Sequence, residues 1–282
     1  MSATLVVASI AFLAGLALTR LAISMGQRLQ LLDLPTAIKP HGRPVPHTGG
    51  TAIVVVAATT MVGLGLLPLA LAAVCIWAIG VADDVRSLPP RLKLVLEAFA
   101  LVLGASALGL SPLPMTLAVI VGVILVNAFN VIDGLDGLAA GCALAPLLVF
   151  MSSDGVAGLL ASSVAASVAA FLVFNRHPAK IFLGDEGSLL LGFTLWTLPF
   201  LAGVNSATPR GALFWLELWL FPLVNAGFVI AFRLRAHRPI MRGDRSHLYD
   251  FWHKHLGLPA TLLACWSIAA LGAVGAVAMG MP

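Results

Sequence analysis

The sequence predicts an all-α, polytopic membrane protein that folds as a single transmembrane domain over residues 1–282. Of its 282 residues, 60% are hydrophobic and 10% are charged, whereas soluble domains carry about 25% charged residues. Such a chain has too few polar side chains to cover a surface that faces water, so most of its exterior must face lipid. An ordinary soluble domain is therefore excluded.

About ten segments are apolar and long enough to cross a bilayer, which takes about 20 residues each. They end at charge clusters or at turn signals such as Pro68 and Asp133-Gly134. The first charged residue is Arg20, so the basic region of a cleaved signal peptide is missing and the first span is expected to stay. The predicted spans cover residues 3–25, 51–67, 68–82, 92–110, 113–132, 134–151, 155–174, 188–204, 212–232 and 259–281.

Basic residues gather in alternate loops, as the positive-inside rule requires of loops kept in the cytoplasm. Fourteen of the 16 Lys and Arg residues, and all 7 histidines, lie in or directly beside four such loops. Both termini are therefore predicted to lie outside. The net charge of +4 reports membrane topology rather than a nucleic-acid partner. The four inner loops are residues 26–50, 83–91, 175–187 and 233–258.

Asp83 and Asp84 end the third predicted span and are followed by Arg86, Arg91 and Lys93. Acids at a helix C-terminus are disfavoured by the helix dipole, which favours a specific role over a solvated helix end. These five residues are expected to form a mixed-charge patch at the membrane surface.

Four polar residues interrupt the apolar sequence of residues 113–151: Asn127, Asn130, Asp133 and Asp136. Carboxylates at membrane depth are costly and usually functional. On an unbroken helix Asn127 would lie opposite Asp136, so convergence on one ligand requires a break. Gly134 and Gly137 allow such a break, because irregular backbone is tolerated in a membrane where it lines an aqueous cavity. The alternative is a short cytoplasmic turn with Asx-type hydrogen bonds.

The segment from Phe182 to Ser188 contains Gly184, Asp185 and Glu186. Its glycines allow backbone amides to approach a phosphate, and its two acids offer the hard oxygen ligands that suit Mg²⁺. It could equally be a helix start, with Ser188 as the N-cap and the acids favoured by the positive end of the helix.

The first and last inner loops supply cations. The run from Lys39 through His41 and Arg43 to Gly50 is too rich in Pro and Gly for regular structure, and residues 233–255 hold six basic residues and four histidines. Histidine beside arginine suits a diphosphate or an anionic lipid headgroup. Positive-inside bias alone, or a metal bound by the last-loop histidines, are the alternatives.

These motifs, in this order, resemble the polyprenyl-phosphate N-acetylhexosamine-1-phosphate transferase superfamily, also called bacterial glycosyltransferase family 4. That superfamily includes the phospho-N-acetylmuramoyl-pentapeptide transferase of peptidoglycan synthesis and the enzymes that initiate O-antigen. The last block, Arg245-Ser-His-Leu-Tyr249, is closer to the O-antigen type, because Tyr249 and Asp250 stand where many members have further histidines. The matching blocks are Asp33–Gly50, Asp83–Lys93, Asn127–Gly137, Phe182–Ser188 and Asp244–Asp250.

The resemblance implies transfer of N-acetylhexosamine-1-phosphate from a UDP-sugar to undecaprenyl phosphate at the cytoplasmic face of a bacterial inner membrane. The products are a polyprenyl-diphosphate sugar and UMP. It implies Mg²⁺, with Mn²⁺ as an alternative, and it leaves open a homodimer and the choice between direct attack and an aspartyl intermediate.

The resemblance also implies roles for single residues. Asp185, with Asn127 nearby, would hold the metal. Asp83 would deprotonate or position the lipid phosphate, supported by Asp84, and Lys93 would contact a phosphate. The nucleotide, diphosphate and sugar would contact Asn130, Asp133, Asp136, Gly184, Lys39, His41, Arg43, Arg245 and His247.

Other functions fit less well. A secondary transporter would place acids at the membrane midplane, but here only Glu97 and Glu217 lie well inside apolar spans. The CDP-alcohol phosphotransferases share a DG-rich helix, but the Asp133–Gly137 segment lacks the Ala-Arg that follows their first Asp-Gly. A non-catalytic scaffold has no use for this set of acids.

Overall fold

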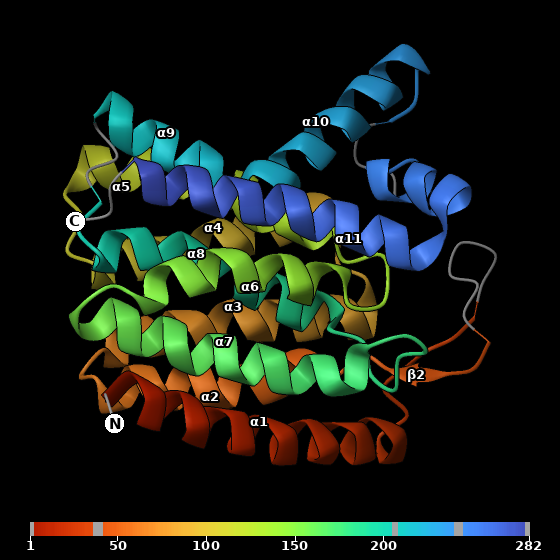
Figure 1. Ribbon diagram of the computed structural model, residues 1–282, viewed down its shortest axis with the longest axis horizontal. Helices are drawn as coiled ribbons and strands as arrows, with labels where there is room; N and C mark the ends of the chain where they lie inside the picture. The colour runs from red at the N-terminus through yellow and green to blue at the C-terminus, as the bar shows by residue number, and fades with distance from the viewer. Residues whose placement is uncertain (1–2, 36–41, 205–207, 240–244, 280–282) are drawn as a thin grey trace.

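The computed structural model describes residues 3–35, 42–204, 208–239 and 245–279. Over these residues the chain forms eleven α-helices, most of them side by side in one bundle, and one two-stranded antiparallel sheet (Figure 1). The elements are α1 (Ala3–Arg28), β1 (Leu32–Asp33), β2 (Val45–Pro46), α2 (Gly49–Gly63), α3 (Leu67–Arg86), α4 (Pro90–Ala107), α5 (Pro112–Val131), α6 (Leu138–Met151), α7 (Gly155–Asn175), α8 (Gly184–Leu201), α9 (Pro209–Leu218), α10 (Leu220–Arg235) and α11 (Leu248–Ala278).

The all-α, polytopic class predicted from the sequence is confirmed. Five helices are long and apolar enough to cross a membrane, and a sixth span is added if the pair α9 and α10 is counted as one. Each predicted span corresponds to one helix, except that the span at 212–232 is two helices bent by 77° at their junction. Because α2 and α6 have only 15 and 14 residues, shorter than the length that spans a bilayer, the count of ten crossings stays a prediction.

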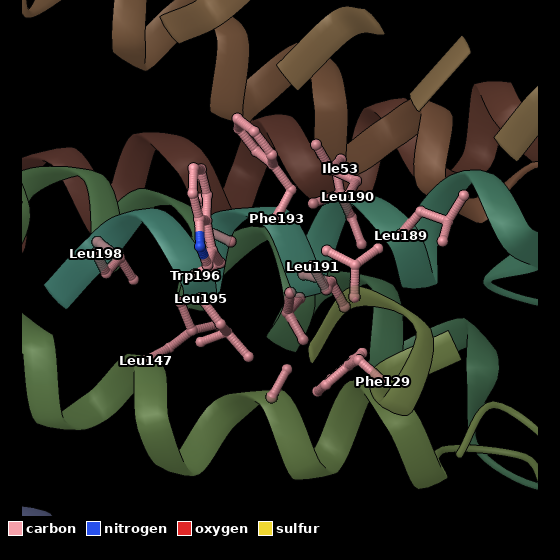
Figure 2. Packing of buried hydrophobic residues seen from close by; sticks show 14 of the residues in the cluster. Ile53, Phe129, Leu147, Leu189, Leu190, Leu191, Phe193, Leu195, Trp196 and Leu198 are labelled. Carbon is pink, nitrogen blue, oxygen red and sulfur yellow. The ribbon is translucent and has the colours of Figure 1, made fainter. Parts of the chain in front are cut away.

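Helix α8 lies at the centre of the bundle and is buried on every side. It packs against α2, α3, α5, α6 and α7, and Figure 2 shows its side chains pointing towards several of these neighbours. Leu189, Phe193 and Trp196 have no exposed surface, and the Trp196 indole nitrogen donates to the Ala118 carbonyl at 3.0 Å. A helix that is apolar all round belongs in such a core. The packing of α8 therefore fixes the position of its first turn.

Two glycines let helices approach the first turn of α8. A Cβ on Gly80 of α3 would lie 2.3 Å from the Glu186 Cα, and one on Gly50 of α2 would lie 2.3 Å from the Gly187 nitrogen. Real Cβ atoms do not come this close to backbone, so only glycine permits the packing. The C-terminal part of α3 and the first turn of α2 are thereby held against the start of α8.

Large apolar side chains cover the outside of the bundle. Leu13 of α1, Leu113 of α5 and Leu271 of α11 are 66%, 71% and 67% exposed. Apolar surface of this extent belongs in lipid, in agreement with the membrane class.

The first inner loop contradicts one prediction. It was expected to lack regular structure, but Leu32 pairs with Pro46 and Asp33 pairs with Val45 in a short ladder, and α2 begins at Gly49. The Pro46 carbonyl also accepts from the Phe182 N–H at 2.8 Å. Proline is tolerated here because a two-stranded sheet consists of edge strands. Lys39 and His41 lie outside the described residues.

Candidate active site

Lys93 joins three helices at one end of the bundle. Its Nζ lies 2.7 Å from Asp83 Oδ2 and 2.5 Å from Asp185 Oδ2, and these groups belong to α4, α3 and α8. The Lys93 and Asp83 side chains are only 13% and 15% exposed. Charges shielded from water interact more strongly than surface pairs, so this ion-pair triad, Asp83, Lys93 and Asp185, is a firm junction between the three helices.

Asn130 of α5 completes the cluster. Its Nδ2 donates to Asp185 Oδ1 at 3.0 Å and to Ser188 Oγ at 2.7 Å. Asp185 therefore has one oxygen held by a cation and the other by an amide. The result is a carboxylate fixed in orientation by two neighbouring helices.

The adjacent acids Asp83 and Asp84 have different partners. Asp83 Oδ1 accepts from the Leu88 N–H at 2.6 Å, just beyond the end of α3. The Asp84 oxygens accept from the backbone N–H groups of Asp185 and Glu186 at 3.1 and 3.2 Å. Those donors are among the N–H groups that a helix N-terminus leaves without intrahelical partners. Asp84 thus caps α8 from a neighbouring helix, while Asp83 holds Lys93.

The start of α8 is a tight turn that requires glycine. Gly184 has a φ of +73°, and a Cβ there would lie 2.4 Å from the His47 carbonyl oxygen. The interpretation of Ser188 as the N-cap is wrong, because α8 begins at Gly184 and Ser188 lies within it. Asp185 and Glu186 do occupy its first turn, where the dipole favours acids.

Glu186 faces away from the ion-pair triad into the protein. It is 3% exposed, and its Oε1 accepts from the Thr51 N–H at 2.7 Å and from Thr51 Oγ1 at 3.1 Å. The two acids of the Gly184–Ser188 segment therefore have different roles. Glu186 links α8 to α2, whereas Asp185 belongs to the ion-pair triad.

Asn127 is paired with a residue that the sequence motifs did not include. Its Nδ2 donates to Glu97 Oε2 at 2.5 Å and to the Val123 carbonyl at 2.9 Å. Glu97 of α4 has no exposed surface. It follows Lys93 by four residues, a spacing that puts both side chains on one helix face and could have drawn attention to it.

The predicted break between α5 and α6 is present, since the intervening residues 132–137 are not helical. The four polar residues do not converge on one point. Asp136 Oδ2 lies 2.7 Å from His177 Nδ1 and accepts from the Ala179 N–H at 3.1 Å. Arg43 donates to the Ala179 carbonyl at 3.3 Å, which brings the first inner loop to the same place.

The last inner loop also reaches this break. Arg245 Nη1 donates to Asp250 at 2.9 Å and lies 3.4 Å from the Gly134 carbonyl, next to Asp133. The Tyr249 hydroxyl donates to the Val131 carbonyl at 3.2 Å. His247, directly before α11, stacks on Tyr249 with ring centroids 4.9 Å apart.

The donor set determines which metal could bind. Among the described residues, no three His, Cys, Asp or Glu side chains are grouped so as to hold an ion by themselves. Mg²⁺, however, is commonly bound by one or two carboxylates together with substrate phosphates and water. Asp185 offers hard oxygen at the centre of the cluster, so the residues fit a magnesium site that a phosphate-bearing substrate completes.

The fold and this cluster define an integral membrane protein with a charged site at one end of its helix bundle. The family described as glycosyl transferase family 4 matches residues 66–202, which include the ion-pair triad and Asn130. The chain belongs to this family, and the resemblance inferred from the sequence motifs is confirmed.

Relatives extend the match beyond those residues. The probable undecaprenyl-phosphate N-acetylglucosaminyl 1-phosphate transferase of Bacillus subtilis (strain 168) is 31% identical in an alignment that covers 82% of this chain and 70% of the relative. The undecaprenyl-phosphate alpha-N-acetylglucosaminyl 1-phosphate transferase of Thermotoga maritima is 30% identical over 87% of this chain and 81% of its own. A phospho-N-acetylmuramoyl-pentapeptide-transferase of Heliobacterium modesticaldum is 33% identical over 60% of this chain and 52% of its own.

Proposed function

We propose that the protein transfers N-acetylhexosamine-1-phosphate from a UDP-sugar to undecaprenyl phosphate, which initiates a cell-surface polysaccharide. Family membership and the names of the two relatives from Bacillus and Thermotoga support this reaction. The structural observation that carries it is the position of Lys93 between Asp83 and Asp185, where three helices meet.

The reaction explains why such a cluster is needed. An oxygen of the lipid phosphate forms a bond to the phosphorus next to the sugar, and the bond from that phosphorus to the bridging oxygen breaks and releases UMP. Both reactants are anions, so cations must offset their repulsion and the charge of the transition state. Lys93 supplies a cation whose direction is set by Asp83. Arg43, Arg245 and His247 supply donors near the break at residues 132–137, where the nucleotide and diphosphate would bind beside Asp133 and Asp136.

We place Mg²⁺ on Asp185, where it would neutralise phosphate charge when bound. Asn130 and Lys93 hold this carboxylate in place. Asn127 is the weaker candidate ligand, because its side chain bonds to Glu97 and to the Val123 carbonyl rather than to Asp185. Gly184 is not kept as a phosphate-binding residue in this proposal, because the next two backbone N–H groups, of Asp185 and Glu186, donate to Asp84.

The membrane topology belongs to the same proposal: about ten spans, both termini outside and the site at the cytoplasmic face of a bacterial inner membrane. It rests on the basic inner loops. The structure supports it in one respect, since residues of all four predicted inner loops come together near the ion-pair triad and the break that follows α5.

The test is release of UMP by the purified chain with undecaprenyl phosphate, Mg²⁺ and a panel of UDP-N-acetylhexosamines. We expect UMP and a lipid-linked sugar with at least one donor, and none with an Asp185→Asn control. Release only with UDP-N-acetylmuramoyl-pentapeptide would instead support the peptidoglycan reaction. No release with any donor would refute the proposal.

A further inference from the structure

A cavity of about 320 Å³ lies between α1 and the end of α7, on elements that contribute nothing to the ion-pair triad. These two helices run side by side along the edge of the bundle (Figure 1). The cavity combines two cations, two neutral hydrogen-bonding side chains and two apolar ones. It is lined by Arg20, Ser24, Gln27, Ile23, Phe174 and Lys180.

The cavity lies where both helices change from apolar to polar. Helix α1 has no charged residue from Ala3 to Leu18, and its first is Arg20. Helix α7 has none from Gly155 to Asn175 and is followed at once by Arg176. A transition of this kind marks the boundary between hydrocarbon and the inner headgroup layer in the topology proposed above.

The lining is built from one face of α1. Its residues at 20, 23, 24 and 27 follow the spacing of three and four that stacks side chains along a helix. Exposed Leu21 and Met25 flank this face, so lipid chains reach the cavity directly. The apolar part of the lining, Ile23 and Phe174, is contributed by both helices.

We propose that this cavity binds the headgroup of an anionic phospholipid, such as phosphatidylglycerol. None of its six lining residues is acidic, so Arg20 and Lys180 present positive charge to an incoming phosphate. Arginine and lysine both recognise phosphate oxygens, and Ser24 and Gln27 can bind the glycerol hydroxyls. A soluble anion would leave Ile23 and Phe174 without a partner, which is why a lipid is the better occupant.

The experiment compares two charge-matched double variants of the full chain in zwitterionic phosphatidylcholine nanodiscs. One variant is Arg20→Gln with Lys180→Gln. The control is Arg28→Gln with Arg176→Gln, which removes two exposed cations from the same end of α1 and α7 outside the cavity. Phosphatidylglycerol is then added, and its binding is followed by native mass spectrometry and by the midpoint of thermal unfolding.

We expect the cavity variant to bind phosphatidylglycerol more weakly by roughly tenfold or more, because it removes both lining cations that would contact the phosphate directly. The control should bind like the wild type. Equal weakening in both variants would show that binding depends on general surface charge rather than on the cavity, and would overturn the proposal. Equal protection of the wild type by glycerol phosphate or inorganic phosphate would also overturn it, in favour of a soluble anion. No turnover is measured, so this proposal and the transferase reaction fail independently.

Discussion

The amide of Asn127 donates to the buried carboxylate of Glu97 and thereby joins α5 to α4 beneath the ion-pair triad. One helical turn from this bond, the same two helices carry Lys93 and Asn130, which both hold Asp185. A polar pair in the apolar part of a membrane protein fixes how two helices align. We therefore expect Glu97 to position the cluster without contacting a substrate.

A double-mutant cycle tests this bond. Glu97→Leu should lower the free energy of unfolding by about 0.6 to 2 kcal/mol, the range for hydrogen bonds between membrane helices. Glu97→Gln keeps an acceptor for Asn127 and should have a smaller effect. Adding Asn127→Leu to Glu97→Leu should cost little more, because the two changes remove one shared interaction. Strict additivity of the two single effects, measured by reversible unfolding in bicelles, would show that the pair does not stabilise the protein.

Substitutions of the neighbouring acids Asp83 and Asp84 of α3 should have different effects on stability and turnover. Asp84→Asn replaces one of the two oxygens that accept from the α8 N–H groups with an NH2 donor, so it should lower the melting temperature as well as turnover. Asp83→Asn leaves those groups paired, and Lys93 keeps its ion pair with Asp185, so it should lower turnover by about 10²-fold with a smaller loss of melting temperature than Asp84→Asn. Equal melting losses in both variants would contradict this division of roles.

The pH profile of Asp83→Asn distinguishes a base from a positioning group. A phosphate monoester has a second pKa of about 6, so a base would matter more at pH 6 than at pH 8. Both Asp83 oxygens accept hydrogen bonds in the structure, from Leu88 and Lys93. We therefore expect that Asp83 orients Lys93 and does not act as a base. The loss of turnover in Asp83→Asn should then be the same at pH 6 and at pH 8. A loss that grows as the pH falls would indicate proton transfer instead.

The two acids at the start of α8 provide a matched test of the metal site. Asp185→Asn should lose activity that extra Mg²⁺ does not restore, because it removes the proposed ligand. Glu186→Gln should keep most activity and lose stability, because Glu186 is buried against Thr51. Mg²⁺ titrations of turnover and melting curves measure the two effects separately. Small, equal losses of activity in both variants would place the metal elsewhere.

The sequence predicted the helices well because each is an apolar run bounded by charge or glycine. Its motifs also picked out Asp83, Lys93, Asn130 and Asp185, although the contacts among them join residues up to 92 positions apart. The single span expected at 212–232 missed the 77° bend between α9 and α10, although Pro222 has no N–H to donate to the Leu218 carbonyl and was the available signal. The sequence places Glu97 inside an apolar span, but the identity of its partner depends on the packing of α4 against α5.

Close packing against α8 gives a prediction about stability. Gly80→Ala would force a methyl group onto the backbone of Glu186 and should cost about 1 to 3 kcal/mol, as overpacking does. Gly227→Ala in α10 has open space around it and should be neutral or stabilising by up to about 1 kcal/mol. Melting curves of both variants measure the contrast. If Gly80→Ala is tolerated as well as Gly227→Ala, the packing of α3 against α8 does not depend on this close approach.

The bent pair α9 and α10 decides how the last part of the chain crosses the membrane. Arg210, in the first turn of α9, donates to the Met279 carbonyl directly after α11, whereas Arg245 lies between α10 and α11 and donates to the Gly134 carbonyl in the break that follows α5. Helix α11 is broken at Gly257, and its longer part, residues 258–278, would be about 31 Å long, enough to cross a bilayer. The two contacts adjoin opposite ends of α11. The pair should therefore cross the membrane once, in spite of its bend.

Reporter fusions after Asp154, Arg210 and Arg245 test that crossing. Asp154 lies between α6 and α7, at the far end of α6 from the break that Arg245 contacts. Alkaline phosphatase should be active after Asp154 and Arg210, which are predicted outside, and inactive after Arg245; green fluorescent protein should give the reverse. If Arg210 and Arg245 sort to the same face, α9 and α10 enter and leave on one side. In that case the basic residues of the last inner loop would no longer support its cytoplasmic position. The placement of Arg245 and His247 in the site would then rest on the contact of Arg245 with Gly134 alone.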